Sequence, residues 1–446
     1  MYEIVIDGLQ SLLSTNRSHQ SDNNVSCTHK YIELWGDRFM CTDCSPAKEI
    51  TATEFPEKFE YETLLKNILG EHNVSGESVN RGIKIGFLVE LCNTFNLRNL
   101  STRQVRRNIV VPMTSSTRCR FVDLPTLRGT EIVGQATTFI SHSWFATFGD
   151  LVDAISEGAD YERIVWIDIF AVRQWPCSKS DLDFERVIRR CNSLLVVIPF
   201  CREILGRECQ QLGLSPMTRQ QIPFFRTWCL YELYFAATTH GVAIVIKLGK
   251  PPAAFNLRYI THNPSERMLT ILSHIIDIDS ASATNPSDKA DLFRRVNSNF
   301  EGGTRGLNTK VQSILLSSAF IYDSSDAILH CAACGDIAAK ESVIASPSTY
   351  IHFIAASGYV NLLQETLSRW FGIVDVVNLG HRNLGTPLMA AIRFGNLPCA
   401  LILLENGADV TLRIDGSWGG RNALQIARDY GYELEILEFV QLLENT

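Results

Sequence analysis

The strongest constraint on the fold is an alternation of short apolar runs with amphipathic stretches in the middle of the chain. The apolar runs occupy residues 137–142, 164–169, 194–198 and 242–246. Strands that alternate with helices form a parallel sheet covered by helices. The nearly continuous apolarity of each run indicates strands that are buried on both faces. The sequence therefore predicts an α/β domain at residues 135–250.

The whole chain is too long for one hydrophobic core. Its 446 residues, 46% hydrophobic and 20% charged, fit about three folded units. The other predicted parts are a flexible leader at 1–22, a zinc-binding module at 23–50, a helical connecting region at 51–134, a helical linker at 251–322 and helical repeats at 323–446. The expected fold class is multidomain, α/β plus α.

Charge and cysteine usage bound the partners and the compartment. A net charge of -7 gives no general attraction to nucleic acid or to anionic membranes, so neither is an expected partner. The N-terminus has no secretory pattern, and the longest apolar stretches are far shorter than the ~20 residues that cross a bilayer. Thirteen cysteines spread over the chain suit reduced thiols. We expect a cytoplasmic protein.

The cysteines near the N-terminus have the spacing of a metal site. Cys27 and His29 are followed by Cys41 and Cys44, which together offer three thiolates and an imidazole. Tetrahedral zinc suits this set, and so short a segment needs a metal to hold its shape. Four protein ligands leave no open position, so the predicted Zn²⁺ is structural and the module is zinc-ribbon-like. The first pair departs from the commonest spacing, which leaves scattered free cysteines as the alternative.

The C-terminal part contains a weak internal repeat with one well-formed unit. The segment Thr386-Pro-Leu-Met-Ala-Ala391 resembles the ankyrin signature, and residues 403–410 resemble the end of such a repeat. The resemblance implies stacked helix pairs that bind a protein partner. The alternative is a plain helical tail that packs on the central domain.

Three motifs in the α/β region, in order, resemble Toll/interleukin-receptor (TIR) domains. They are Phe139-Ile-Ser-His-Ser-Trp144 at the first strand, residues 167–174 after the second, and Trp228-Cys-Leu-Tyr-Glu-Leu233 on a later helix. The resemblance covers about 110 residues and implies a flavodoxin-like parallel sheet. Because TIR relatives often act when self-associated, it also implies a homo-oligomer formed through this domain.

The TIR resemblance implies an activity and a set of site residues. Active members cleave NAD⁺ and carry a glutamate four residues after a tryptophan-like position, where Glu232 stands relative to Trp228. Cleavage of the nicotinamide–ribose bond develops oxocarbenium-like charge, which the Glu232 carboxylate would stabilise as the catalytic group. NAD⁺ would be a substrate. The expected substrate-binding residues, which follow strand ends or lie on that helix, are Ser143, Trp144, Asp168, Phe170, Arg173 and Trp228.

Each of these assignments has a structural alternative. Trp144 or Phe170 would stack on a flat ring and Arg173 would meet the pyrophosphate, but packing or surface exposure explains all three equally well. Glu232 is a solvated helix residue in the alternative interpretation, and the protein is then a non-enzymatic signalling adaptor. In the first interpretation it is an NAD⁺ glycohydrolase of intracellular defence or stress signalling, regulated by its repeats. A run of arginines at positions 103, 106, 107, 118 and 120 is predicted to be a solvated helix face.

Overall fold

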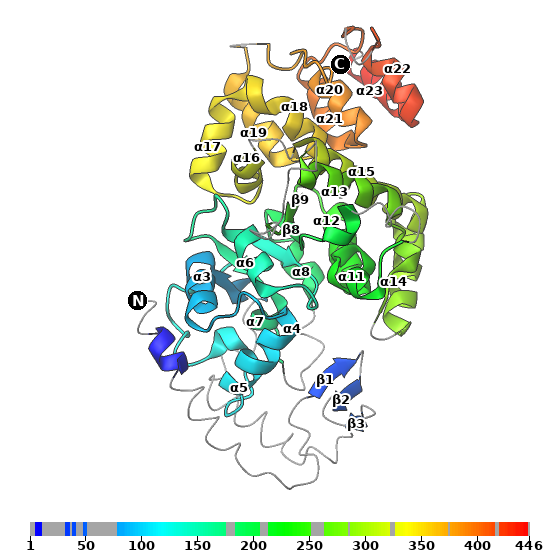
Figure 1. Ribbon diagram of the computed structural model, residues 1–446. Helices are drawn as coiled ribbons and strands as arrows, with labels where there is room; N and C mark the ends of the chain where they lie inside the picture. The colour runs from blue at the N-terminus through cyan, green and yellow to red at the C-terminus, as the bar shows by residue number, and fades with distance from the viewer. Residues whose placement is uncertain are drawn as a thin grey trace.

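The computed structural model describes most of the chain from residue 78 onward and short segments before it. The described residues are 5–10, 32–35, 38–41, 48–50, 78–174, 183–205, 213–250, 263–283, 286–321, 326–372, 375–414 and 419–444. A mixed α/β body occupies the middle of the molecule, and a helical region is stacked on one end of it (Figure 1).

The centre of the body is a sheet that has six strands within the described residues, in the order β5-β4-β7-β6-β8-β9. Its strands are β4 (Gly82–Lys84), β5 (Val133–Gly134), β6 (Thr138–Ser141), β7 (Ile164–Trp166), β8 (Ser193–Ile198) and β9 (Ala243–Leu248). The strands β6 to β9 are parallel to one another, whereas β4 pairs antiparallel with both β5 and β7. The four apolar runs of the sequence therefore form the parallel part of the sheet.

Both faces of the sheet are buried, as the continuous apolarity predicts. The helices of the body are α3 (Ile85–Thr94), α4 (Thr102–Val105), α5 (Val111–Met113), α6 (Phe148–Ser156), α7 (Asp168–Ala171), α8 (Phe184–Ile188), α9 (Arg202–Leu205), α11 (Pro216–Gln221) and α12 (Thr227–Thr238). Side chains of α3 and α6 pack with Ile140 of β6 on one face. Side chains of α8 and α12 pack with Phe139 on the other. Alternate residues of one strand thus belong to two separate cores.

The body includes parts that the sequence did not predict to belong to it. The strands β4 and β5 come from the region expected to be a helical connection, and α3 packs beside α6. Residues 5–10, expected in a flexible leader, form a helical turn in which Val5, Ile6 and Leu9 are buried. The sequence did not predict this turn because its apolar pattern is short and a long polar run follows it.

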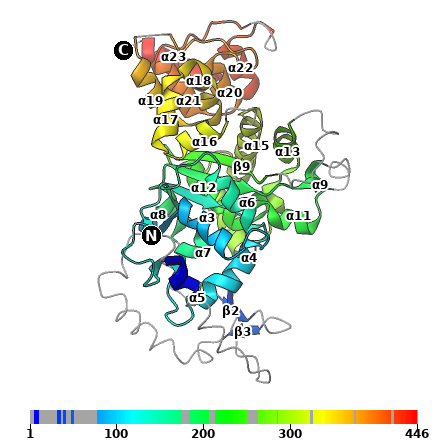
Figure 2. The same ribbon diagram turned by 60° about the vertical axis from the view of Figure 1, so that its left-hand side comes forward.

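The helices after the sheet connect the body to the helical region. They are α13 (Pro264–Ile275), α14 (Pro286–Asn299) and α15 (Gly303–Ile321), and they extend the core on the α12 face. Four helix pairs follow within the described residues: α16 (Asp326–Ala333) with α17 (Ile337–Ala345), α18 (Pro347–Ser357) with α19 (Val360–Trp370), α20 (Pro387–Arg393) with α21 (Leu397–Glu405), and α22 (Ala423–Tyr430) with α23 (Glu433–Glu444). In the turned view they again lie beyond β9, with α22 and α23 farthest from the body (Figure 2).

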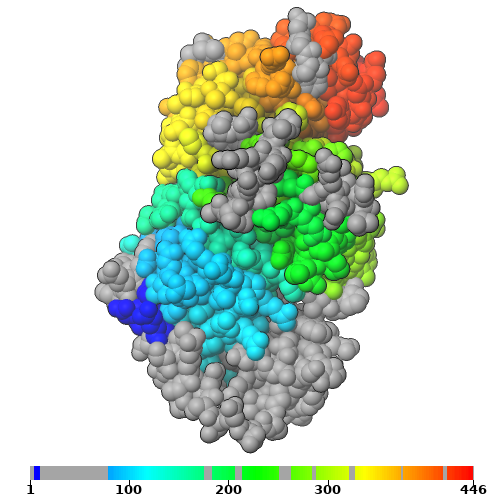
Figure 3. All heavy atoms as spheres, viewed as in Figure 1, coloured from blue at the N-terminus to red at the C-terminus, as the bar shows by residue number. Residues whose placement is uncertain are grey.

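The first repeat helices attach to the beginnings of the parallel strands. Thr138, the first residue of β6, donates its hydroxyl to Cys334 O at 3.2 Å, and Asn361 donates to Gly241 O, just before β9, at 3.0 Å. Arg163, which precedes β7, forms a buried ion pair with Asp336 at 3.2 Å. The repeat region therefore sits on the N-terminal end of the sheet, and the spheres of the two regions meet without a break in Figure 3.

A small antiparallel sheet precedes the body. Its strands are β1 (Ile32–Trp35), β2 (Arg38–Cys41) and β3 (Lys48–Ile50), with Ile32 opposite Cys41. Among the described residues, no helix is both long and apolar enough to span a membrane.

Candidate active site

The chain after β6 is held by its own side chains and by a neighbouring segment. Ser143 donates its hydroxyl to Gln220 O at 2.5 Å and accepts from the backbone N–H of Phe145 at 3.3 Å. Ser143 is buried, whereas Trp144 and Phe145 are partly exposed. The turn therefore presents two aromatic rings at the C-terminal end of the sheet.

The helix α12 places Glu232 against the end of β6. Apolar residues surround the helix on nearly all sides, and a helix of that kind is buried. Glu232 is 6% exposed. Cys229, one turn earlier, points its thiol at His142 O with a sulfur–oxygen distance of 3.5 Å, which fixes this face of α12 on the strand end. The interpretation of Glu232 as a solvated helix residue is therefore wrong.

The Glu232 carboxyl group lies in surroundings that disfavour its charge. Burial raises the pKa of Glu232 well above its usual value, the Ser141 hydroxyl opposes the rise, and Asp168 adds to it. Among the described residues, neither Glu232 Oε2 nor Ser141 Oγ has a hydrogen-bond partner of normal geometry. A buried carboxyl oxygen without a partner destabilises the fold, so groups of this kind concentrate at functional sites.

Asp168 ties the second strand end to the first. Its carboxylate accepts from Trp144 Nε1 at 2.7 Å and from the N–H of Ile169 at 2.7 Å, the latter at the start of α7. Burial raises the pKa of Asp168, while His142, Trp144 and Arg106 lower it. Burial also lowers the pKa of His142, and within the described part of the chain His142 Nε2 has no partner. We call the following residues the polar cluster: Ser141, His142, Asp168, Cys229 and Glu232.

The segment between β4 and β5 completes this end of the body. Its backbone runs beside the turn after β6: Arg103 N–H donates to Trp144 O at 2.9 Å and Phe148 N–H donates to Leu100 O at 2.7 Å. A Ser-x-x-Gln capping box, Ser101 with Gln104, starts α4 and orients the arginines that follow. Arg106 donates to Gln174 Oε1 at 2.8 Å, and its guanidinium lies over the Trp144 ring.

The structure brings some of the predicted site residues together and separates others. Ser143, Trp144 and Asp168 lie at the strand ends beside Glu232, although the Ser143 hydroxyl is engaged with Gln220. Trp228 lies apart from them, because its indole N–H donates to Asp288 at 3.1 Å and its ring packs on Phe184.

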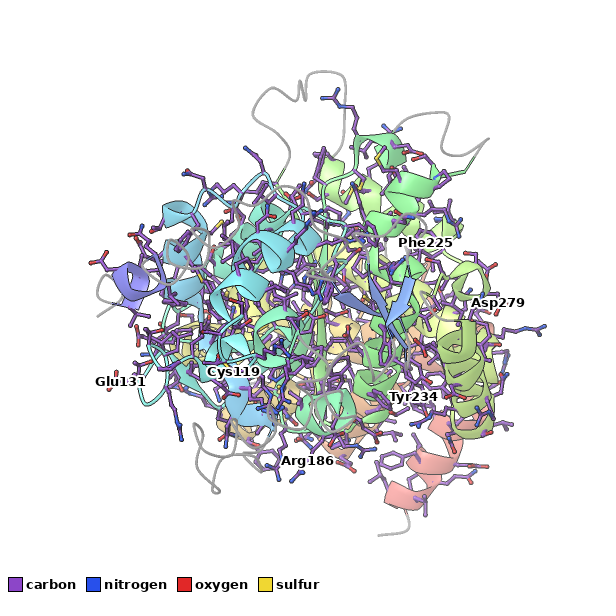
Figure 4. The ribbon with its side chains drawn as sticks, turned by 90° about the horizontal axis from the view of Figure 1, so that it is seen from below. Cys119, Glu131, Arg186, Phe225, Tyr234 and Asp279 are labelled. Atoms are coloured by element: carbon purple, nitrogen blue, oxygen red, sulfur yellow. The ribbon has the colours of Figure 1, made fainter. Side chains whose placement is uncertain are left out.

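Phe170 is a correction to the predicted set, whereas the structure does not test Arg173. Phe170 is fully buried and packs against Phe121 and Phe148, so its ring has no face left for a ligand. Arg173 lies near Cys119, whose pKa burial raises to about 11 with Arg173 among the groups that oppose the rise. Cys119 is well separated from Phe225, which ends the 3-10 turn just before α12 (Figure 4). The role of Arg173 at a pyrophosphate stays a prediction. Arg106 is the guanidinium that reaches Trp144.

Sequence reasoning missed Arg106, His142 and Arg226 as members of this end of the body. Arg106 and Arg120 are buried, so the expected solvated face is wrong for these two residues. The capping box at Ser101 was the available signal that a helix starts there and directs its arginines. For His142, the only signal in the sequence was its position at the end of a predicted strand.

The predicted zinc ligands fall largely outside the described residues. Cys27, His29 and Cys44 are not described, and Cys41 is described only as the last backbone position of β2. The register of Ile32 with Cys41 means that the chain enters β1 and leaves β2 at the same end of the hairpin. Within the ranges that the structure describes, no His, Cys, Asp and Glu side chains group as a metal site. The zinc site stays a prediction.

Comparison with known proteins identifies one segment of the chain. The ankyrin repeat family model matches residues 383–415, which contain α20 and α21. The comparisons with curated proteins and with solved structures gave no match. In the matched segment Thr386 caps α20 by accepting from Met389 N–H at 3.2 Å, and Pro387 takes the first helical position. Residues 383–415 are an ankyrin repeat, and repeats of this type bind proteins.

Proposed function

We propose that the sheet domain is TIR-like and hydrolyses NAD⁺ at the nicotinamide–ribose bond, with Glu232 as the catalytic residue. The observation that carries the proposal is the buried Glu232 carboxyl group, which has an oxygen without a described partner at the end of β6. The ankyrin repeat would bind a protein partner that regulates this activity in the cytoplasm, and homo-oligomers would form through the sheet domain.

The strand order supports the proposed position of the site. Taken in chain order, the parallel strands stand in the sheet as second, first, third and fourth, which is how the flavodoxin-like order begins. In such sheets the direction of winding reverses between the first and third strands, and ligands bind at the C-terminal ends there. The first strand is β6, and the polar cluster lies at its C-terminal end.

Cleavage of the nicotinamide–ribose bond needs two contributions from the protein, namely a negative charge near the ribose and a surface that orients the substrate. When the bond between nicotinamide nitrogen and ribose C1′ breaks, the electron pair leaves with nicotinamide, which becomes neutral. The ribose carries the positive charge until water adds and a proton is released. A Glu232 carboxylate stabilises that charge, and the exposed side of Trp144 offers a surface for a flat ring. Asp168 is then a positioning residue, because it holds the indole N–H.

The raised pKa of Glu232 is compatible with this role. The nicotinamide ring of NAD⁺ carries a positive charge, and a cation beside a carboxyl group lowers the pKa of that group. Substrate binding would therefore favour the ionised form of Glu232 in the complex. The bound cation would also supply the partner that the carboxylate lacks among the described residues.

The test is nicotinamide release from NAD⁺ by the purified full chain, measured in dilute solution and under crowding. Glu232→Gln should lower kcat by roughly 100-fold, the usual effect of removing one electrostatic stabiliser. Glu365→Gln, on the exposed surface of α19, is the matched control and should match the wild type. Equal rates for wild type and Glu232→Gln would remove Glu232 from the mechanism. No release under any condition would contradict the enzyme and favour the adaptor.

A further inference from the structure

Three guanidinium groups gather on the two aromatic rings beside the polar cluster. The Arg103 and Arg226 guanidinium carbons lie 5.7 and 5.2 Å from the centre of the Phe145 ring, and that of Arg106 lies 5.7 Å from Trp144. They come from distant parts of the chain, two from the segment between β4 and β5 and one from the N-cap of α12. We call these residues the arginine cluster: Arg103, Arg106 and Arg226.

Within the described part of the chain, Arg226 is a cation without an acidic partner. Its described side-chain hydrogen bond is to a hydroxyl, Ser282 Oγ, at 3.2 Å. Among the described residues no carboxylate pairs with it, and burial lowers the pKa of its guanidinium. A partly buried charge of this kind destabilises the protein until an anion binds to it.

The arrangement also concentrates positive charge. Arg103 and Arg226 share one ring, which brings two positive charges close together. Arg226 is the N-cap residue of α12 and makes no side-chain cap hydrogen bond, so the partial positive charge of the helix N-terminus adds to the same region. Asp168, the member of the polar cluster whose pKa Arg106 lowers, is already engaged by Trp144 and Ile169.

We propose that the arginine cluster is a binding subsite for the diphosphate group of a nucleotide. Stacking on Phe145 uses the flat face of the Arg226 guanidinium, whose N–H edge could then meet oxygen anions, for which phosphate is the geometric match. The proposal rests on the proposed function for the identity of the ligand. With the nicotinamide ribose at Glu232, the diphosphate of NAD⁺ would extend over Trp144 and Phe145.

The subsite depends on the segment between β4 and β5, which is held in place by backbone contacts. Gly149 N–H donates to Arg98 O at 3.1 Å, and a Cβ added at Gly149 would lie 2.5 Å from that oxygen. Only glycine allows this close approach. The fold therefore positions the arginines at 103 and 106, and they belong to the C-terminal end of the sheet together with α12.

The experiment is a calorimetric titration of the full chain with ADP, AMP and adenosine as probes. ADP should bind more tightly than AMP, and adenosine should bind most weakly. Arg103→Gln and Arg226→Gln should each weaken ADP binding by roughly tenfold, the effect of losing one charged hydrogen bond. Arg226→Lys, which keeps the charge but loses the planar N–H edge, should keep only part of the affinity. Arg369→Gln, at an exposed ion pair of α19, is the matched control.

The outcomes separate the subsite from the catalytic proposal. Equal ADP affinity in Arg103→Gln, Arg226→Gln and wild type would overturn the subsite, as would adenosine binding as tightly as ADP. Arginine-dependent ADP binding without any nicotinamide release would support the subsite while the catalytic proposal fails. Nicotinamide release that depends on Glu232, with one KM for NAD⁺ in all the arginine variants, would support catalysis and overturn the subsite.

Discussion

The two ends of the parallel sheet differ in whether a buried carboxyl group has a buried cation beside it. At the N-terminal end, Arg163 forms an ion pair with Asp336 and donates to Ile155 O, and Asp336 also accepts from Asp160 N–H at 3.0 Å. Within the described residues some atoms of this pair, such as Arg163 Nε and Asp336 Oδ1, have no hydrogen-bond partner, so opposite charge is what joins the two side chains. At the C-terminal end, the Glu232 carboxyl group also keeps an oxygen without a described partner, and the charged group that acts on it is another acid, Asp168. The ion pair specifies how the repeat region docks, whereas the carboxyl group without a described cation is where a cationic ligand would bind.

The largest expected effect is at the paired end. Asp336→Ala leaves the Arg163 guanidinium buried beside no acid, which should reduce the free energy of unfolding by about 3–5 kcal/mol in urea denaturation. Asp429→Ala, which breaks the exposed pair with Arg421, is the control and should cost under about 1 kcal/mol. The folded fraction of Asp336→Ala should still bind ADP. A loss below 1 kcal/mol at Asp336 would show that this contact does not hold the repeats.

The next largest effect concerns the contact between Gly149 of α6 and the segment that carries Arg103, at the C-terminal end of the sheet. Gly149→Ala should reduce the free energy of unfolding by about 1–3 kcal/mol because of the clash with Arg98 O, although alanine is the better helix former. It should also weaken ADP binding, because the segment that bears Arg103 is displaced. Ser156→Ala in the same helix should change stability by less than about 0.5 kcal/mol. A stabilised Gly149→Ala would exclude the segment from the site.

The smallest effect has the opposite sign. Because the folded protein raises the pKa of Glu232, this group contributes stability below its unfolded pKa, and the contribution is lost as pH rises through the folded pKa. Glu232→Gln should therefore increase the free energy of unfolding by about 1 kcal/mol or less, seen as a higher melting temperature. This gain in stability should grow as the pH rises. A gain that is the same at all pH values would mean that Glu232 keeps an ordinary pKa.

The pH dependence of the proposed reaction tests the charge state of the Glu232 carboxyl group directly. The acid limb of kcat/KM should lie above the usual glutamate range, because that ratio reports the free protein. The acid limb of kcat should lie lower, because the substrate cation favours the carboxylate. Identical limbs in both profiles would contradict a cationic ligand next to Glu232.

The sequence predicts the parallel strands well because each is an unbroken apolar run between turn residues. It does not predict β4, since Gly82-Ile-Lys84 is too short to show a period. Trp144 and Asp168 were predicted from strand ends, where side chains from separate segments meet. Arg226 and Arg106 were missed because charge alone does not tell a solvated face from a buried one. The burial of Glu232 had a usable signal, a single carboxylate in a helix that is apolar on all sides.

The docking of the repeats at the strand beginnings has a consequence for assembly. A partner bound to the ankyrin repeat would dock at the opposite end of the sheet from Glu232, away from the polar and arginine clusters. A partner with several binding positions would gather copies of the chain and raise the local concentration of their sheet domains without any new contact at the site. Crowding on such a scaffold would then turn on the activity of the sheet domain, and the repeats would serve only to attach each copy of the chain to the partner.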